Sequence, residues 1–102
     1  MSDPSLVIEK KKSTSKKIKP PKKYKVVVFN DNVTTVEFVI AMLIAVFDRD
    51  QETAIQITQH VHENGSGVAG TYAYEIAEQK CYEGVELSRN NGFPLVLKIV
   101  EE

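Results

Sequence analysis

The sequence predicts an α+β fold with the element order β-α-α-β-α-β, in which a small sheet is covered by helices on one face. Two observations support this prediction. The β-branched and aromatic run at 24–29 and the apolar run at 94–100 are typical of strands. Between them, three segments repeat apolar residues at helical spacing. Three short strands and three helices bury their apolar faces when one sheet packs against one layer of helices.

Length and composition allow one small domain. The chain has 102 residues, of which 42% are apolar and 26% are charged, and these values are ordinary for a soluble globular protein. The apolar runs fall short of the roughly 20 residues that span a bilayer, and the first residues lack the pattern of a secretory signal. We therefore expect a cytoplasmic protein that does not bind a membrane.

Charge divides the chain after Lys23. Residues 1–23 hold eight lysines against two acidic residues, a net charge of +6, whereas residues 24–102 hold five basic against twelve acidic residues, a net charge of −7. We predict a flexible Lys-rich extension at 1–23 and one folded domain at 24–102. Binding of nucleic acid by the lysines is disfavoured, because no aromatic or arginine residue lies among them.

The first strand is predicted at 24–29, and a turn of three short polar residues follows it. Thr34 and Glu37 have the spacing of a capping box, so a helix with Thr34 as its cap is expected here. It should close at residues 48–49. The turn residues are Asn30, Asp31 and Asn32, and the apolar stripe of the helix is Val36, Val39, Ile40, Leu43 and Phe47.

Asp50 is expected to cap a second helix that ends at the Asn-Gly-Ser-Gly sequence of residues 64–67. A short strand is then predicted at 68–72, a third helix at 74–90 and the last strand at 94–100. The expected inward stripes are Ala54, Ile55, Thr58, Val61 and His62 in the second helix, and Ile76, Ala77, Lys80, Cys81 and Val85 in the third.

Residue types used in catalysis are present without the arrangement that catalysis requires. Cys81 is the single cysteine, so it forms no intramolecular disulfide, and we expect a buried thiol. His60 and His62 are two positions apart, which points them in different directions on a helix and excludes a metal pair. There are no paired carboxylates, no nucleophile beside a base and no phosphate-binding glycine loop. We expect no enzymatic activity, no metal and no cofactor.

The turn and the start of the first helix form a candidate recognition site. Asn30, Asp31 and Asn32 place polar acceptors at a turn, and Val36 and Val39 follow on one helix face. Such a site could hold an amine at its polar end and an apolar side chain against the valines. Taken alone, a polar triplet of this kind is more often simply a turn.

Taken together, these motifs resemble the ClpS family, whose members are adaptors that bring proteins with particular N-terminal residues to the Clp AAA+ unfoldase and protease. The resemblance implies a small α/β sandwich in which a three-stranded antiparallel sheet packs on three helices. The motifs occur in the family's order: Pro20-Pro21 before Tyr24-Lys25-Val26, Asn-Asp-x-x-Thr from Asn30, Glu37-Phe38-Val39-Ile40, Val61-His62, Gly70, Glu75-Ile76-Ala77-Glu78 with Lys80, and Pro94-Leu95.

The resemblance also implies a binding site. The free α-amino group of a substrate would be held by Asn30, Asn32 and His62, with Asp31 beside them, because an ammonium has only donors and needs acceptors around it. The first side chain of the substrate, large and apolar or aromatic, would be buried in a pocket, and the unfoldase would dock on the third helix. The pocket maps to Thr34, Val36, Val39, Thr58, Val61 and Leu95, and the docking surface to Glu75, Glu78 and Lys80.

Five positions depart from the family pattern. Asn32 replaces an aspartate, Val36 and Thr58 replace methionines, Thr35 replaces a proline, and Ala73 replaces a threonine cap. Two hypotheses follow. The first is a monomeric adaptor that binds N-degron substrates and the N-terminal domain of a ClpA- or ClpC-type unfoldase. The alternative is a regulator that docks on the unfoldase and alters substrate choice without binding N-degrons in the usual way.

Overall fold

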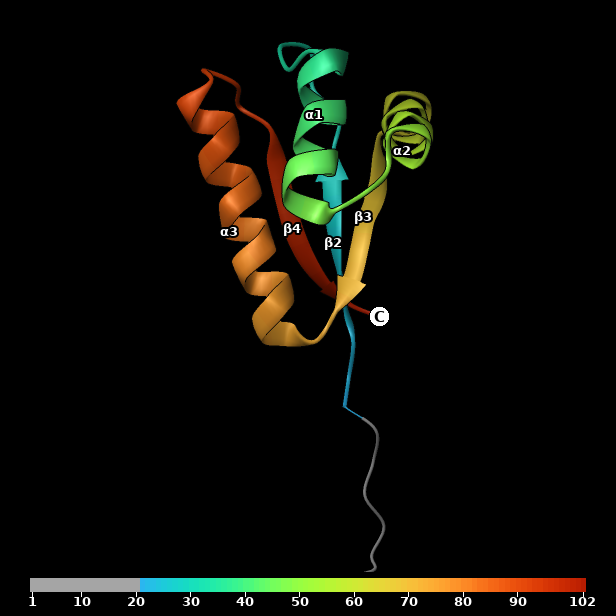
Figure 1. The fold of residues 1–102 in the computed structure, drawn as a ribbon, viewed down its shortest axis with the longest axis vertical. Coiled ribbons are helices and arrows are strands. Elements are labelled where there is room, and N and C mark those ends of the chain that lie inside the picture. Colours follow the sequence, from blue (N-terminus) through green and yellow to red (C-terminus); the bar gives the residue numbers. More distant parts are fainter. Residues whose placement is uncertain (1–20) are drawn as a thin grey trace, which may run out of the picture.

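A three-stranded antiparallel sheet forms one layer of the protein and three helices form the other (Figure 1). The structure is a computed structural model and describes residues 21–102. The strands are β2 (Tyr24–Phe29), β3 (Ser66–Tyr72) and β4 (Val96–Glu101), and β2 lies between the other two. The element order is β-α-α-β-α-β, which confirms the predicted fold class. Of the predicted extension at 1–23, residues 1–20 lie outside the described residues.

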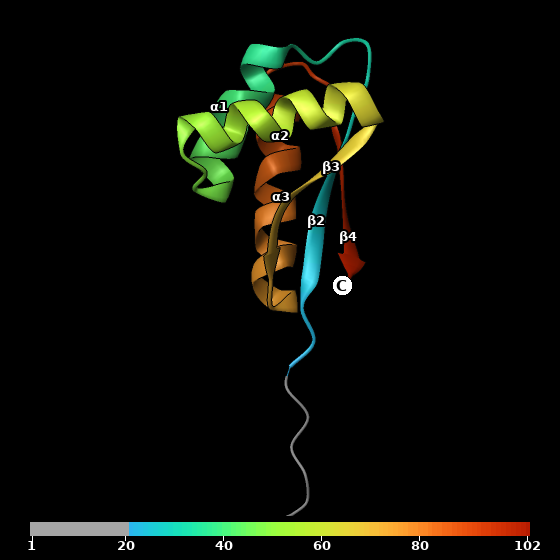
Figure 2. The ribbon, with the colours of Figure 1, turned by 90° about the vertical axis from the view of Figure 1, so that its right-hand side faces the viewer.

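The helices are α1 (Val36–Phe47), α2 (Gln51–Asn64) and α3 (Tyr74–Asn90). All three lie on the same side of the sheet, as the view in Figure 2 shows. Within residues 21–102, no helix combines the length and the hydrophobicity that crossing a membrane requires.

Alternating burial along β2 explains why only one face of the sheet carries helices. Val26 and Val28 are fully buried and pack under the helices, whereas Val27 and Phe29 point to the other face and are half-buried. The buried pair joins an apolar core with residues of all three helices and of β3 and β4: Val39, Met42, Leu43, Val46, Phe47, Ala54, Val61, Ala69, Ala77, Leu95 and Leu97.

The cap of α1 was predicted one residue too early. Thr35, and not Thr34, is the N-cap, and its hydroxyl accepts a hydrogen bond from the backbone N–H of Phe38 at 3.2 Å. The Thr34 hydroxyl is already engaged, because it donates to the carboxylate of Asp31 at 2.8 Å. The position of Asp50 at the N-cap of α2 is as predicted, and Ala73 occupies the N-cap of α3 without a side-chain hydrogen bond.

Two strands begin at other residues than predicted. β3 begins at Ser66 rather than Val68, because Ser66 and Gly67 pair with Phe29 and Val28 of the central strand. β4 begins at Val96, two residues after the predicted start, and ends one residue later than predicted. The predicted bounds of α3 agree with the structure.

The inward stripes of α2 and α3 are narrower than predicted. Ile55 and His62 of α2 are exposed, as is Ile76 of α3, while the positions that face the sheet most directly, such as Ala54 and Ala77, are fully buried. Cys81, predicted as a buried thiol, is only partly covered.

Candidate functional site

A cavity of about 500 Å³ opens where the central strand ends. We call it the main cavity. Its wall is formed by the turn after β2, the first turns of α1 and the C-terminal half of α2. The lining residues are Asn30, Asp31, Asn32, Val33, Thr34, Thr35, Val36, Glu37, Val39, Thr58, Val61 and His62.

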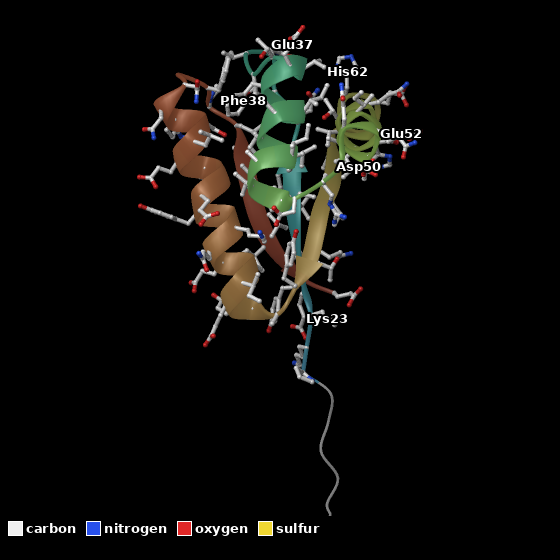
Figure 3. The ribbon with its side chains drawn as sticks, in the orientation of Figure 1. Lys23, Glu37, Phe38, Asp50, Glu52 and His62 are labelled. Carbon is white, nitrogen blue, oxygen red and sulfur yellow. The ribbon has the colours of Figure 1, made fainter. Side chains whose placement is uncertain are left out.

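Two backbone hydrogen bonds bring the turn and α2 together. The Asn30 N–H donates to the carbonyl of Gly65 at 2.9 Å, and the Gly65 N–H donates to the carbonyl of Val61 at 2.8 Å. Gly65 ends α2 with a φ of 91°, a left-handed conformation that glycine adopts without steric strain. His62 therefore lies beside the turn, and Figure 3 shows it at the same end of the molecule as Glu37, opposite Lys23.

Asp31 holds the turn in shape. One carboxylate oxygen accepts hydrogen bonds from the backbone N–H groups of Val33 at 2.8 Å and Thr34 at 2.7 Å, and the other accepts from the Thr34 hydroxyl. Partial burial acts to raise the pKa of Asp31, but the hydrogen bonds from Thr34 and Val33 and the positive charge of Arg89 outweigh it and leave the pKa below its usual value. The carboxylate is therefore ionised at neutral pH and committed to the turn.

The mouth of the main cavity presents uncommitted polar groups. Asn30, Asn32 and His62 are exposed, and their side-chain polar atoms have no hydrogen-bond partner within residues 21–102. The two amide oxygens and one imidazole nitrogen can accept hydrogen bonds from a ligand. Glu37, in the first turn of α1, adds a carboxylate to the lining.

The deeper wall is apolar. Val39 and Val61 are buried at 6% and 3% exposure, while Val36 is half exposed near the opening. Thr58 is also buried, and its hydroxyl donates to the carbonyl of Ala54 one turn earlier at 2.7 Å. The partner that this hydroxyl requires is thus supplied within α2, so the wall has no unsatisfied polar group at this position.

The structure brings nine of the ten predicted amine-binding and side-chain-pocket residues to one cavity. The exception is Leu95, which is 1% exposed, belongs to the apolar core and is not part of the lining. Three lining residues, Val33, Thr35 and Glu37, were not predicted. These three residues are adjacent in sequence to the predicted turn and helix start. Because the side chains of a short loop and of the helix start that follows it share one opening, this adjacency could have predicted that they line the cavity.

The three predicted docking residues differ in accessibility. Glu75 and Glu78 are exposed on the first turns of α3. The Lys80 ammonium is mostly covered: it donates to the carbonyl of Val46 at 2.8 Å and pairs with Asp48 at 3.3 Å. Lys80 therefore supplies the positive charge that favours the C-terminus of α1, and α1 has no basic residue of its own in that turn.

No group of three or more His, Cys, Asp or Glu side chains within residues 21–102 is arranged to hold a metal ion. Burial raises the pKa of the Cys81 thiol, which disfavours the reactive thiolate.

Residues 19–98 match the family described as ATP-dependent Clp protease adaptor protein ClpS. The chain belongs to the ClpS family. It is 49% identical over 85 residues to the ATP-dependent Clp protease adapter protein ClpS of Clostridium acetobutylicum, covering 83% of this chain and 84% of the relative. It is 43% identical over 100 residues to that of Myxococcus xanthus, covering 98% of this chain and 92% of the relative.

A solved structure of the same family has the same fold. The structure of Agrobacterium tumefaciens ClpS2 bound to L-phenylalaninamide superposes with a TM-score of 0.78 at 37% identity, covering 81% of this chain and 100% of that chain. As a ClpS protein, the chain is an adaptor of the Clp protease rather than a protease.

Proposed function

We propose that this ClpS adaptor binds proteins through a free N-terminal α-amino group and a large apolar or aromatic first side chain, and delivers them to a Clp AAA+ unfoldase. The observation that carries the proposal is the main cavity, where uncommitted acceptors stand at the mouth and apolar side chains form the wall. The ClpS2 relative bound to L-phenylalaninamide supports it, since that ligand has a free amine and a benzyl side chain.

The mouth suits an ammonium group. Asn30, Asn32 and His62 offer acceptors from two elements that the Asn30–Gly65 hydrogen bond holds together. An ammonium has three donors and no acceptor, so the three acceptors at the mouth are enough in number to satisfy it. An acetylated terminus or an internal residue has too few donors, and it would leave acceptors unpaired at a cost of about 1–3 kcal/mol.

Glu37 is the carboxylate that we propose faces the ammonium charge. With an asparagine at position 32, the turn has one acid, and the Asp31 carboxylate is bound within the turn. The Glu37 side chain is exposed and lines the main cavity, and it lies at the same end of the molecule as His62 (Figure 3). An ion pair at such an exposed position contributes about 0.2–1 kcal/mol.

The wall suits a large apolar side chain. Burying such a side chain against Val36, Val39 and Val61 contributes roughly 1.5–3 kcal/mol. The valine at position 36 and the threonine at position 58 are less bulky than methionine, and the cavity of about 500 Å³ has room for an aromatic ring. The proposed substrates therefore begin with Phe, Tyr, Trp or Leu.

Peptide binding tests the proposal directly. A peptide that begins with Phe is expected to bind with a Kd in the micromolar range or better, and its N-acetylated form is expected not to bind. Titration calorimetry or fluorescence anisotropy measures both. Absence of binding by peptides beginning with Phe, Tyr, Trp and Leu would refute N-degron recognition by this chain.

The alternative is that the chain docks on the unfoldase and changes substrate choice without binding N-degrons. Asn32 favours this alternative, because it removes a charge from the mouth of the cavity. The Asn32→Asp variant separates the two: peptide binding that arises only in the variant supports the regulator, whereas binding by the parent chain excludes it.

For the partner surface, we propose that Glu75 and Glu78 contact the N-terminal domain of a ClpA- or ClpC-type unfoldase in the cytoplasm, with one adaptor monomer per contact. Both side chains are exposed on α3, away from the main cavity. Lys80 contributes by fixing α3 to the end of α1. The double variant Glu75→Ala with Glu78→Ala is expected to weaken binding to the isolated unfoldase domain while leaving the Kd for the Phe peptide unchanged.

A further inference from the structure

A second, smaller cavity of about 260 Å³ adjoins the main cavity. We call it the side cavity. It lies between α1 and α2 and shares Val36, Thr58 and His62 with the main cavity. Beyond this shared wall its lining consists of Ile40, Ile55 and Gln59. The two cavities are therefore neighbours in one groove, and the side cavity lies on the side away from the polar turn.

The side cavity has the size and chemistry for one aliphatic side chain. Ligand pockets for drug-sized molecules begin at about 300 Å³, and the side cavity is smaller than that. Ile55 is 43% exposed and Val36 is 50% exposed, so apolar surface remains uncovered here that a ligand would remove from water. Gln59 and His62 are exposed at its rim and offer polar groups to a peptide backbone.

The spacing along the helices identifies which residue of a bound chain reaches the side cavity. Ile40 lies four residues after Val36 and Ile55 three residues before Thr58, steps of about 4.5–6 Å along a helix. In an extended peptide, the second side chain points away from the first, and the third returns to the same side about 7 Å further on. After the first residue, the third is the nearest one whose side chain returns to the same side, and its step is comparable to this helical spacing.

We propose that the side cavity is a subsite for an aliphatic side chain at the third position of the substrate, such as Leu, Ile or Val. The proposal rests on the proposed function, because the first residue must occupy the main cavity with its amine at the turn. The peptide then runs from Asn30 and Asn32 across the shared wall toward Ile40 and Ile55.

Three peptides that differ only at positions two and three test the subsite: Phe-Gly-Gly, Phe-Gly-Leu and Phe-Leu-Gly, each followed by the same soluble tail. Leucine at position three is expected to tighten binding about three- to tenfold, as partial burial of a leucine predicts. Leucine at position two is expected to leave the Kd unchanged.

The variant Ile55→Ser removes one wall of the side cavity without touching the main cavity. It is expected to abolish the advantage of Phe-Gly-Leu while keeping the Kd of Phe-Gly-Gly. Ile44→Ser is the matched control, because Ile44 is 40% exposed on α1 and lines neither cavity. The control should retain the full advantage, and thermal melting of both variants shows that each is folded.

Equal affinity of Phe-Gly-Gly and Phe-Gly-Leu would overturn the subsite while leaving the proposed function intact. An advantage for Phe-Leu-Gly in place of Phe-Gly-Leu would overturn the assignment to the third residue. Failure of all three peptides to bind would refute the proposed function and the subsite with it.

Discussion

Replacing Asp31 by alanine tests whether the turn at the main cavity is held by one carboxylate. The change removes three hydrogen bonds of 2.7–2.8 Å, two from the backbone N–H groups of Val33 and Thr34 and one from the Thr34 hydroxyl. Within residues 21–102, Asp31 is the only charged side chain that accepts hydrogen bonds from these three donors. The turn would then rely on water to satisfy them.

The expected loss follows from these bonds. A hydrogen bond contributes about 0.5–1.5 kcal/mol net, and the lower half of that range applies because the site is partly exposed. Three bonds give a loss of about 1.5–3 kcal/mol in the free energy of unfolding at pH 7, which lowers the Tm of a domain of this size by about 6–24 °C. Urea denaturation and thermal melting measure both quantities. The variant Asp31→Asn keeps one side-chain oxygen, so its stability should lie between that of the parent protein and that of Asp31→Ala.

The pH dependence separates the carboxylate from a general packing effect. The pKa of Asp31 is lowered in the folded protein, so the carboxylate stabilises the fold above its unfolded pKa of about 3.9, and this contribution is lost as pH falls through the folded pKa. The stability difference between parent and Asp31→Ala is therefore full at pH 6 and shrinks below about pH 4. A difference under about 0.5 kcal/mol at pH 6, or one that persists unchanged at pH 2.5, would refute the assignment.

Three further predictions, two of them with a control variant, test the site and the contacts that support it. Glu37→Gln is expected to weaken binding of a free-amine Phe peptide up to about fivefold at low salt. The control Glu52→Gln, in the first turn of α2 and outside the cavity lining, should leave binding unchanged. Equal effects of the two variants in titrations would exclude Glu37 as the counter-charge. Lys80→Met is expected to lower the free energy of unfolding by about 1–2 kcal/mol in urea, and an unchanged midpoint would contradict its role at the end of α1. Gly65 and Gly92 have φ values of 91° and 80°, so alanine at either position should lower the free energy of unfolding by about 1–2 kcal/mol. Only Gly65→Ala should also weaken peptide binding, because the carbonyl of Gly65 accepts the hydrogen bond from Asn30 that holds the turn.

The element types were predictable because each depends on a local pattern. The β-branched run of β2 and the helical spacing of α3 specify their structures over several residues, and the predicted bounds of these two elements agree with the structure. Ser66 and Gly67 have no strand preference of their own, and they join β3 because the backbone of β2 pairs with them. Pairing of this kind depends on a distant segment, so the local sequence did not reveal it.

The local pattern predicted the part of the site formed by the turn and the start of α1, whereas the residues that α2 contributes were predicted only through the family resemblance. Neither predicted the contacts that connect the site internally. Two adjacent threonines can each cap α1, and the choice falls on Thr35 because Asp31 already binds Thr34. The family resemblance placed Leu95 in the side-chain pocket, but in the structure the core covers this residue fully. Lys80 was expected in the inward stripe of the third helix and, from the resemblance, on the docking surface, and only the packing of α3 against α1 shows that its ammonium binds the carbonyl of Val46. A contact within the turn decides the first of these cases, and packing between elements decides the other two.

The turn divides its polar residues by role. Asp31 points its carboxylate back at the turn and determines its shape, while Asn30 and Asn32 are exposed at the mouth and remain available to a ligand. A change at position 31 therefore alters stability first and affinity through the displaced neighbours. We expect a change at position 32 to alter ligand affinity without altering the turn, because the Asn32 side chain makes no hydrogen bond within residues 21–102. The Asp31 carboxylate keeps its negative charge while it accepts the hydrogen bonds of the turn, and it lines the main cavity together with Glu37. We therefore expect both carboxylates to act on a bound ammonium, and Glu37 to be the one whose removal leaves the turn intact.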